Sequence, residues 1–208
     1  MSAPATDIGR LRRFIADMTS LVGGAWQDKD EAAILEVGRK LLSELVSHDD
    51  WLPEASAKCP PHGYAQNLLW CDPFERFSVV SFVWAPSAAT PVHDHAVWGM
   101  VGMLRGSEIS QAYERNAAGG PLRLGPATTL KPGDVETLSP AAGDIHKVNN
   151  ALSDCGSISI HVYGGNIGAV RRSVFDAATG VAQLFVSGYT NQVQPNLWDR
   201  SAEMRAGR

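Results

Sequence analysis

The sequence predicts a mainly β protein, an antiparallel barrel or sandwich, preceded by two helices. Apolar residues recur at helical spacing through about the first fifty positions, and short β-branched and aromatic runs separated by Gly, Pro and Asn follow. The 208 residues, 44% hydrophobic and 19% charged, are enough to bury one core. We expect residues 1–50 to form a helical segment packed on the β domain, and residues 51–208 to form that domain.

The helical pattern runs from about residue 7 to residue 47. Gly23-Gly24 divides it into two amphipathic segments, and Asp28 and Asp30 are both candidates for the N-cap of the second. Gly38 lies inside the second segment, where glycine costs up to about 1 kcal/mol of helix propensity relative to alanine. The pattern therefore predicts two helices.

The β pattern consists of runs that most of the 20 glycines and 12 prolines separate, as closely spaced turns require. The predicted strands cover residues 77–84, 97–104, 108–113, 135–138 and 157–163. After Pro195 strand and helix signals are few, which is typical of a loosely packed terminus.

Charge and composition exclude several classes of function. The formal net charge of -4 does not favour binding to nucleic acid or to an anionic membrane surface. None of the three cysteines has a CxxC or other metal-ligand spacing, and no apolar run is long enough for a signal peptide or a membrane span. We expect a cytoplasmic protein with reduced cysteines, and its oligomeric state stays open.

Histidines carry most of the functional information. His93 and His95 occur in PVHDHAVWG, where the period of a strand would send both imidazoles to one face and Asp94 to the other. His146 follows a predicted Pro- and Gly-containing turn that leads into another strand. Three neutral imidazoles from two strands would form an open metal site, although imidazole suits Fe, Zn, Cu and Ni alike.

The order of these motifs resembles the paired motifs of the cupin superfamily. HxH is followed by a Gly-containing strand end at 104–106, and PxxGxxH comes about fifty residues after HxH. Cupins usually carry a glutamate shortly after HxH, but here no carboxylate follows until Glu108. This departure is typical of the three-histidine cupins, of which the thiol dioxygenases are best known. The resemblance implies a cupin (double-stranded β-helix, jelly-roll) barrel with N-terminal helices.

Further segments resemble the cysteine dioxygenase (thiol dioxygenase) family. Residues 64–68 are similar to its Tyr-x-Arg-Asn-Leu segment, residues 146–150 to its His-Arg-Val-Glu-Asn stretch, and residues 159–163 match its Ser-x-His-x-Tyr row. The resemblance covers roughly residues 60 to 180. It implies Fe(II) bound by His93, His95 and His146, with addition of both oxygen atoms of O2 to the sulfur of a small thiol to give a sulfinate.

The residues fit that chemistry. Three neutral ligands leave the charge of a divalent ion uncompensated, which favours a substrate thiolate and keeps coordination positions open. Ser159, His161 and Tyr163 alternate, so on one strand they would form a hydrogen-bonded row that places the tyrosine hydroxyl near substrate. The alternative is a polar network without a chemical role. In animal members of the family this tyrosine is cross-linked to a cysteine, but Gly99 or Met100 occupies that place here, so we predict no cross-link.

The predicted substrate follows from Gln66, which replaces the arginine of cysteine-selective members. An arginine would bind a carboxylate through two charged hydrogen bonds, which glutamine cannot do. Members with this glutamine resemble 3-mercaptopropionate dioxygenases, so we rank 3-mercaptopropionate ahead of cysteine. Either Arg171 or Arg172, with Tyr64, is the candidate for binding the carboxylate, and we favour Arg172.

Two other functions remain open. A non-catalytic metal-binding cupin that senses a small acid explains the histidines equally well, but it gives no reason for the alternation of Ser159, His161 and Tyr163. A cupin isomerase or hydrolase using Zn or Mn is less favoured. It would need a general base near the ligands, and the nearest carboxylate, Asp94, should face away.

Overall fold

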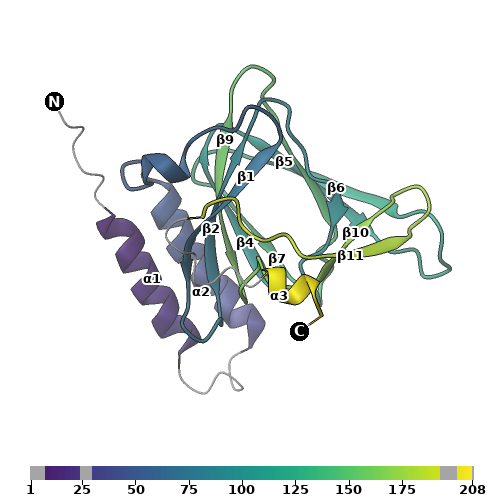
Figure 1. Cartoon of the computed structure of the whole chain (residues 1–208), viewed down its shortest axis with the longest axis horizontal. Coiled ribbons are helices and arrows are strands. Elements are labelled where there is room, and N and C mark those ends of the chain that lie inside the picture. Colours follow the sequence, from purple (N-terminus) through teal and green to yellow (C-terminus); the bar gives the residue numbers. More distant parts are fainter. Residues whose placement is uncertain (1–7, 24–29, 193–200, 208) are drawn as a thin grey trace.

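The computed structural model describes residues 8–23, 30–192 and 201–207. Two helices, α1 (Gly9–Val22) and α2 (Glu31–Val46), precede two antiparallel sheets, and a short helix, α3 (Ser201–Arg205), ends the described chain (Figure 1). The strands are β1 (Tyr64–Cys71), β2 (Ser78–Trp84), β3 (Val92–His93), β4 (Gly99–Arg105), β5 (Glu108–Glu114), β6 (Arg123–Leu130), β7 (Val135–Leu138), β8 (His146–Asn150), β9 (Ser157–Tyr163), β10 (Arg172–Phe175) and β11 (Ala182–Phe185). No helix within these ranges is long and apolar enough to cross a membrane.

The two sheets face each other in Figure 1, with β1, β2, β4 and β9 on one side and β5, β6, β10 and β11 on the other. Their strand orders are β1-β2-β9-β4-β7 and β11-β10-β3-β8-β5-β6. Within the described residues no ladder joins one sheet to the other, so the mainly β fold with N-terminal helices is confirmed, but the sheets are not closed into the barrel that the resemblance implies. The outer strands β6 and β11 are largely exposed, and each sheet covers the inner face of the other without closure.

Five predicted strands, corresponding to β2, β4, β5, β7 and β9, are confirmed to within about two residues at each end. Every residue of β2 and β9 is buried, which explains their strong apolar signal. β6 was not predicted because its sequence, RLGPATTL, contains Gly and Pro. These residues weaken an interior strand but are tolerated at a sheet edge.

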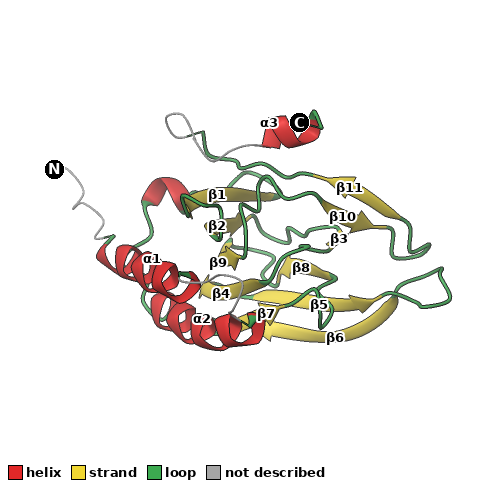
Figure 2. Cartoon of the chain, turned by 90° about the horizontal axis from the view of Figure 1, so that it is seen from below, coloured by secondary structure: helices red, strands yellow, loops and turns green. Residues whose placement is uncertain are grey.

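The two N-terminal helices pack on the outer side of the five-stranded sheet (Figure 2) and share its hydrophobic core. Asp30 caps α2, since its side chain accepts a hydrogen bond from the backbone N–H of Ala32, whereas Asp28 lies outside the described residues. Gly38 faces β4 so closely that a Cβ there would lie 2.8 Å from Met100 Cε. Close packing of helix on sheet therefore accounts for this glycine.

The C-terminal end of the described chain differs from its prediction. Residues 193–200, including Pro195, lie outside the described residues, but α3 follows them as a helix with Ser201 buried. Arg205 donates hydrogen bonds of 3.2 Å to the backbone carbonyls of Val186 and Ser187. These contacts tie the end of the described chain to the segment after β11.

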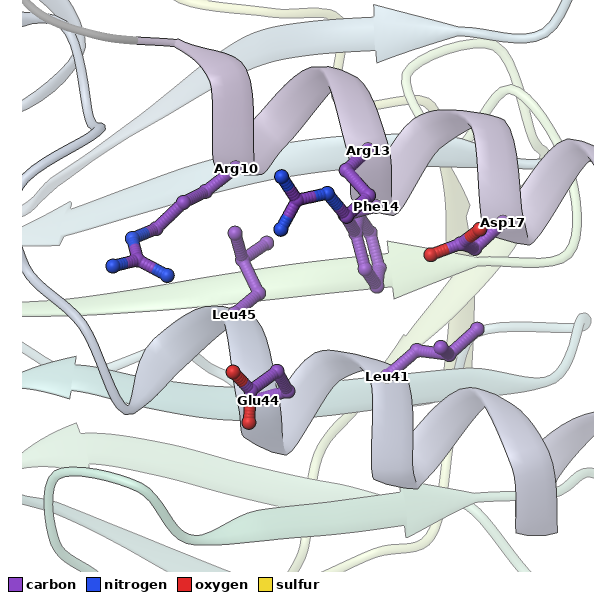
Figure 3. A pocket seen from close by; sticks show the side chains of 7 residues that line it. All are labelled: Arg10, Arg13, Phe14, Asp17, Leu41, Glu44 and Leu45. Carbon is purple, nitrogen blue, oxygen red and sulfur yellow. The ribbon is translucent and has the colours of Figure 1, made fainter.

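A small hollow of about 60 Å³ lies between α1 and α2. Its lining side chains are Arg10, Arg13, Phe14, Asp17, Leu41, Glu44 and Leu45 (Figure 3). Charged groups surround an apolar floor, and Arg10 also pairs with Asp50 at 2.9 Å. The lining includes no imidazole or thiol, so this hollow has none of the metal ligands that the sequence predicts. The predicted site residues lie in the β domain instead.

Candidate active site

The three predicted histidines come together inside the β domain. The antiparallel pairing of β3 with β8 sets His93 directly opposite His146, although the two are far apart in sequence. His95 lies just beyond the end of β3, and the three rings have centroids 4.8 to 4.9 Å apart. One nitrogen from each ring lies within 4.8 Å of the others, and all three side chains are buried. The predicted convergence is confirmed.

Hydrogen bonds orient two of these rings. His93 Nδ1 lies 3.1 Å from the carbonyl oxygen of Pro91, and His146 Nδ1 lies 3.0 Å from the hydroxyl of Ser110. The carbonyl of Pro91 can only accept, so His93 carries its proton on Nδ1 and its Nε2 is unprotonated, whereas the hydroxyl of Ser110 can either accept from His146 Nδ1 or donate to it. Partners of this kind fix the tautomer and orientation of histidines that bind metals.

His95 is held differently, through its backbone. Its N–H donates to Asp144 Oδ2 at 2.8 Å, and the same oxygen lies 3.4 Å from Nδ1 of the ring. Neither ring nitrogen of His95 has a hydrogen-bond partner. A buried polar group left without a partner costs about 1–3 kcal/mol. A ligand for this ring would recover that cost.

Electrostatics keep the cluster neutral. Burial lowers the pKa of His93 to about 4, and burial together with the neighbouring histidines lowers the pKa of His95 and of His146 well below the usual value. All three imidazoles are therefore uncharged at neutral pH, which is the form that binds a metal ion. No carboxylate or thiol of the described residues joins the cluster. This donor set fits a divalent transition metal with open coordination positions.

The predicted row of polar side chains also forms, on β9. Ser159 Oγ lies 2.8 Å from His161 Nε2, and His161 Nδ1 lies 2.8 Å from the hydroxyl oxygen of Tyr163. Trp84 Nε1 donates to Ser159 Oγ at 3.2 Å, and Phe82 packs against the imidazole with ring centroids 4.2 Å apart. Burial lowers the pKa of His161 to about 3, so this ring is neutral too.

The row and the cluster meet at Tyr163. Its ring stacks on His95 with centroids 5.4 Å apart and an interplanar angle of 24°. Across the sheet Gly99 pairs with Tyr163, and a Cβ at position 99 would lie 3.1 Å from the tyrosine Cδ1. Burial raises the pKa of the Tyr163 hydroxyl. Tyr163 therefore stays protonated beside the cluster at neutral pH.

A cavity of about 40 Å³ opens beside His93 and Tyr163. Its lining residues are Tyr64, Gln66, Phe82, Thr90, Pro91, His93, Tyr163, Arg172 and Phe185. A wider hollow of about 350 Å³, bordered by residues 185–190, shares Tyr64, Gln66 and Phe185 with it. The inner space admits only a few heavy atoms, and the wider hollow offers a route to it.

Of the two candidate arginines, the structure places Arg172 in the cavity and Arg171 outside it. Arg172 is 6% exposed, donates from Nη1 to the carbonyl of Ile167 at 2.8 Å, and has no partner at Nε. Its guanidinium lies over the ring of Phe185, 4.6 Å from the centroid. Arg171 is exposed and donates to the carbonyl of Met204. Arg172 is thus the buried cation available to an anionic ligand.

Gln66 and Tyr64 line the cavity as predicted, but Gln66 is committed to the chain segment after β11. Its amide nitrogen donates to Ser187 Oγ at 3.2 Å and to the carbonyl of Gly188 at 3.0 Å. Only its carbonyl oxygen is left for a ligand. Tyr64 is 38% exposed at the mouth, so it is less enclosed than the other lining aromatic residues. Substrate contact by either residue stays a prediction.

Sequence reasoning missed several residues that support the site. Ser110 and Asp144 hold the histidines, while Phe185 and the segment 187–190 enclose the cavity. Ser110 had a detectable signal, because it alternates with Glu108 on a predicted strand and so shares its inner face. The segment after β11 had none, because its role depends on long-range hydrogen bonds to β1.

Comparisons with known proteins identify no family. No model of a protein family matches the chain. Among solved structures, it is similar to TT1209 from Thermus thermophilus (18% identity, TM-score 0.42, 54% of this chain and 92% of that one). It is also similar to an uncharacterized Klebsiella pneumoniae protein with a double-stranded β-helix domain (16%, 0.41, 64% and 87%) and to an oxalate oxidase in complex with glycolate (16%, 0.41, 51% and 53%). At these TM-scores the likeness indicates no function.

Proposed function

We propose that the protein is a non-haem iron thiol dioxygenase that converts a small thiol carboxylate to a sulfinate. The observation that carries the proposal is the meeting of three features in one buried space. These are a three-histidine cluster without a carboxylate, a hydrogen-bonded tyrosine stacked on that cluster, and an arginine with an unpartnered nitrogen. A site that only bound metal would have no need of the second and third features.

The proposed reaction balances without a further reductant. A thiolate and O2 combine to a sulfinate, so two sulfur–oxygen bonds form, the O–O bond breaks, and sulfur supplies the four electrons. Fe(II) held by His93, His95 and His146 would supply affinity for the thiolate and the redox chemistry with O2. The residues of this chain bind and orient the substrate, exclude water and place a hydroxyl proton.

Arg172 is proposed to bind the substrate carboxylate. Arg172 takes part in none of the ion pairs found among the described residues, although the more distant charge of Asp94 favours its cation. Burial lowers its pKa, which shows that the surroundings disfavour the free cation. A substrate anion would relieve that penalty, and a charge-assisted hydrogen bond contributes about 1.5–3 kcal/mol.

Tyr163 is proposed to place a hydroxyl proton next to the reacting sulfur. Its ring is fixed between His95 and Gly99, and its oxygen is held by His161. Because the pKa of the hydroxyl is raised, the group acts as a hydrogen-bond donor or acceptor and not as an anion. The apolar rings of Phe82 and Phe185 line the same cavity and would limit the entry of water.

Among thiols we propose 3-mercaptopropionate ahead of cysteine. The small inner cavity favours a short substrate, and Arg172 offers one buried cation for one carboxylate. Position 66 carries glutamine in place of the arginine that would pair with the carboxylate of cysteine. The two amide hydrogens of Gln66 are donated to Ser187 and Gly188, so they are not available to a substrate carboxylate either. The ranking follows from that substitution.

The test is oxygen uptake and sulfinate formation by the iron-loaded protein with 3-mercaptopropionate and with cysteine. Arg172→Gln should raise KM for 3-mercaptopropionate by about 10-fold or more, because a charged contact is lost. Arg171→Gln is the matched control, since the neighbouring arginine lies outside the cavity, and its KM should not change. Thiols that bind to the iron-loaded protein without consuming oxygen would refute the proposal in favour of a non-catalytic binding protein.

A further inference from the structure

Phe185, the last residue of β11, borders both of the spaces that lead to the histidine cluster. Its side chain lines the inner cavity of about 40 Å³ and also the wider hollow of about 350 Å³. Two other residues line both spaces, but Tyr64 is exposed at the mouth and Gln66 is held by its hydrogen bonds to Ser187 and Gly188. The ring of Phe185 is therefore an apolar wall that the two spaces share.

The pairing of β10 with β11 places this ring next to the buried cation. Phe185 lies directly opposite Arg172 in the antiparallel ladder, so the two side chains are on the same face of the sheet. The guanidinium lies over the ring, 4.6 Å from its centroid. Arginine stacks on aromatic faces in this way, and the contact is stronger where the cation is desolvated, as it is here at 6% exposure. The ring therefore covers one face of the group that would bind a carboxylate.

Hydrogen bonds hold the chain that follows Phe185. Arg205 donates to the first two carbonyls of the segment 186–188, at 3.2 Å each. The last N–H of this segment donates to the carbonyl of Gly168 at 3.0 Å, and the side chain of Gln66 donates to the segment as well. The backbone next to the ring is thus held by three other parts of the chain, so the ring cannot move aside without the loss of several hydrogen bonds.

This fixed ring restricts what can bind at Arg172. An acid whose carboxylate is bound there must place its remaining atoms in the inner cavity, which admits only a few heavy atoms. A longer or branched acid would have to extend toward the wider hollow, at whose border the ring of Phe185 lies. Overlap with a fixed side chain is a repulsive way to reject a ligand, and it adds to any difference in attractive contacts.

We propose that Phe185 is a specificity-determining residue whose ring limits the size of the carboxylic acid that binds at Arg172. Short unbranched acids fit inside the inner cavity, and longer acids do not. The inference deepens the proposed function, and its effect on catalysis rests on that function. The size limit itself depends only on side chains of the protein and holds for acids without a thiol, so it can be measured in the absence of turnover.

The test compares the binding of propionate and hexanoate to the full-length protein without metal, so that neither acid can bind through a metal ion. Nitrogen-15 NMR follows the Nε–H signal of Arg172, which Arg172→Gln identifies by its loss. In the parent, the dissociation constant for hexanoate should be at least about 10-fold higher than that for propionate, because the extra methylenes do not fit. In Phe185→Ala hexanoate should bind at least as tightly as propionate.

Leu184→Ala is the matched control. Leu184 precedes Phe185 on β11, is 65% exposed and lines neither space, because neighbouring side chains of a strand face opposite sides. This variant should keep the preference of the parent for propionate. Phe185→Leu retains an apolar side chain of intermediate size, so its ratio of dissociation constants should fall between those of the parent and Phe185→Ala.

Two results would overturn the inference directly. One is a parent that binds both acids equally, which needs no variant and so keeps the inference testable even if a substitution prevents folding. The other is a preference for propionate that survives in Phe185→Ala. An Arg172 signal that neither acid shifts would overturn it as well, because no carboxylate would then bind at that residue.

Turnover distinguishes this inference from the proposed function. If the iron-loaded protein oxygenates thiols, the ratio of kcat/KM for 3-mercaptopropionate over 6-mercaptohexanoate should fall by at least about 10-fold from the parent to Phe185→Ala. A size limit on carboxylate binding without any oxygenation would refute the proposed function and leave the inference on Phe185 standing. Oxygenation of 3-mercaptopropionate with an unchanged preference in Phe185→Ala would do the reverse.

Discussion

The histidine cluster and the polar row of β9 meet where Tyr163 stacks on His95, yet they satisfy their polar atoms in different ways. In the row, each side chain has a hydrogen-bond partner within the protein; these are Ser159, His161 and Tyr163, together with Trp84, which donates to Ser159. In the cluster, His93 and His146 each use one nitrogen, and His95 uses neither. The side chains of the row satisfy one another, whereas each of the three buried imidazoles of the cluster has at least one ring nitrogen without a hydrogen-bond partner.

This difference separates two kinds of buried polarity. A satisfied network mainly fixes positions, and removing one member leaves its neighbours unpartnered. An unsatisfied cluster costs free energy that only an added ligand can recover. We therefore expect the cluster to bind a ligand and the row to position side chains. Variants of the row that lose the ligand, or variants of the cluster that keep it, would contradict this assignment.

The largest expected effect is loss of metal on truncation of the cluster. His146→Ala removes one of the three proposed metal ligands, so the affinity for Fe(II) should fall by more than about 100-fold. Substitution of a residue that only hydrogen-bonds to a ligand usually costs about 10- to 100-fold. Metal content after dialysis, measured by elemental analysis, should drop from about one equivalent to nearly none.

The matched variant for this prediction is His161→Ala in the row. It removes an equally buried imidazole that is not a proposed ligand, so the metal content should stay at that of the parent while catalysis declines. Equal metal loss in both variants would erase the distinction between cluster and row.

The second prediction concerns stability without metal as a function of pH. Burial lowers the pKa of His93 to about 4 and of His161 to about 3, and the pKa values of His95 and His146 are lowered as well. Below about pH 6.5 the unfolded chain takes up protons that the folded chain does not. The free energy of unfolding should therefore fall, by more than about 2 kcal/mol between pH 6.5 and pH 5.

Glu108 makes the free energy of unfolding depend on pH in the opposite direction. Burial raises the pKa of its carboxyl to about 8, so between about pH 4.5 and pH 8 it ionises in the unfolded chain before the folded one, and stability falls as pH rises. Below pH 6.5 the four histidines outweigh it. Urea unfolding of the chelated protein should show a maximum of the free energy of unfolding near pH 7, with a shallower alkaline decline in Glu108→Gln. Stability that does not change from pH 5 to pH 6.5 would contradict the neutral cluster.

Much of this site could be predicted from sequence because its residues follow strand periodicity. Ser159, His161 and Tyr163 alternate on a strand whose seven residues are all buried, so spacing alone places them on one face. His93 and His95 also converge, although β3 ends at His93 and the expected period does not extend to His95. That geometry depends on the backbone bond to Asp144, which spacing does not reveal.

Long-range closure could not be predicted in the same way. The choice between Arg171 and Arg172 depends on which of two adjacent residues faces inward where β10 begins, and β10 is a strand next to the sheet edge with a weak sequence signal. The open sandwich, in place of a closed barrel, likewise depends on which strand edges meet. Such pairings are set by global packing, and no local pattern encodes them.

The smallest expected effect tests whether the hydrogen bonds around the cluster serve metal binding. Ser110→Ala removes the partner of His146 Nδ1, so the ring loses its fixed orientation, and affinity for Fe(II) should fall by about 10-fold. Ser81→Ala is the control, because its buried hydroxyl donates at 2.8 Å to the carbonyl of Ser56 and touches neither cluster nor row. Each variant should lose about 1 kcal/mol of stability. Metal titration should separate them, and an equal affinity in the two would mean that Ser110 only supports the fold.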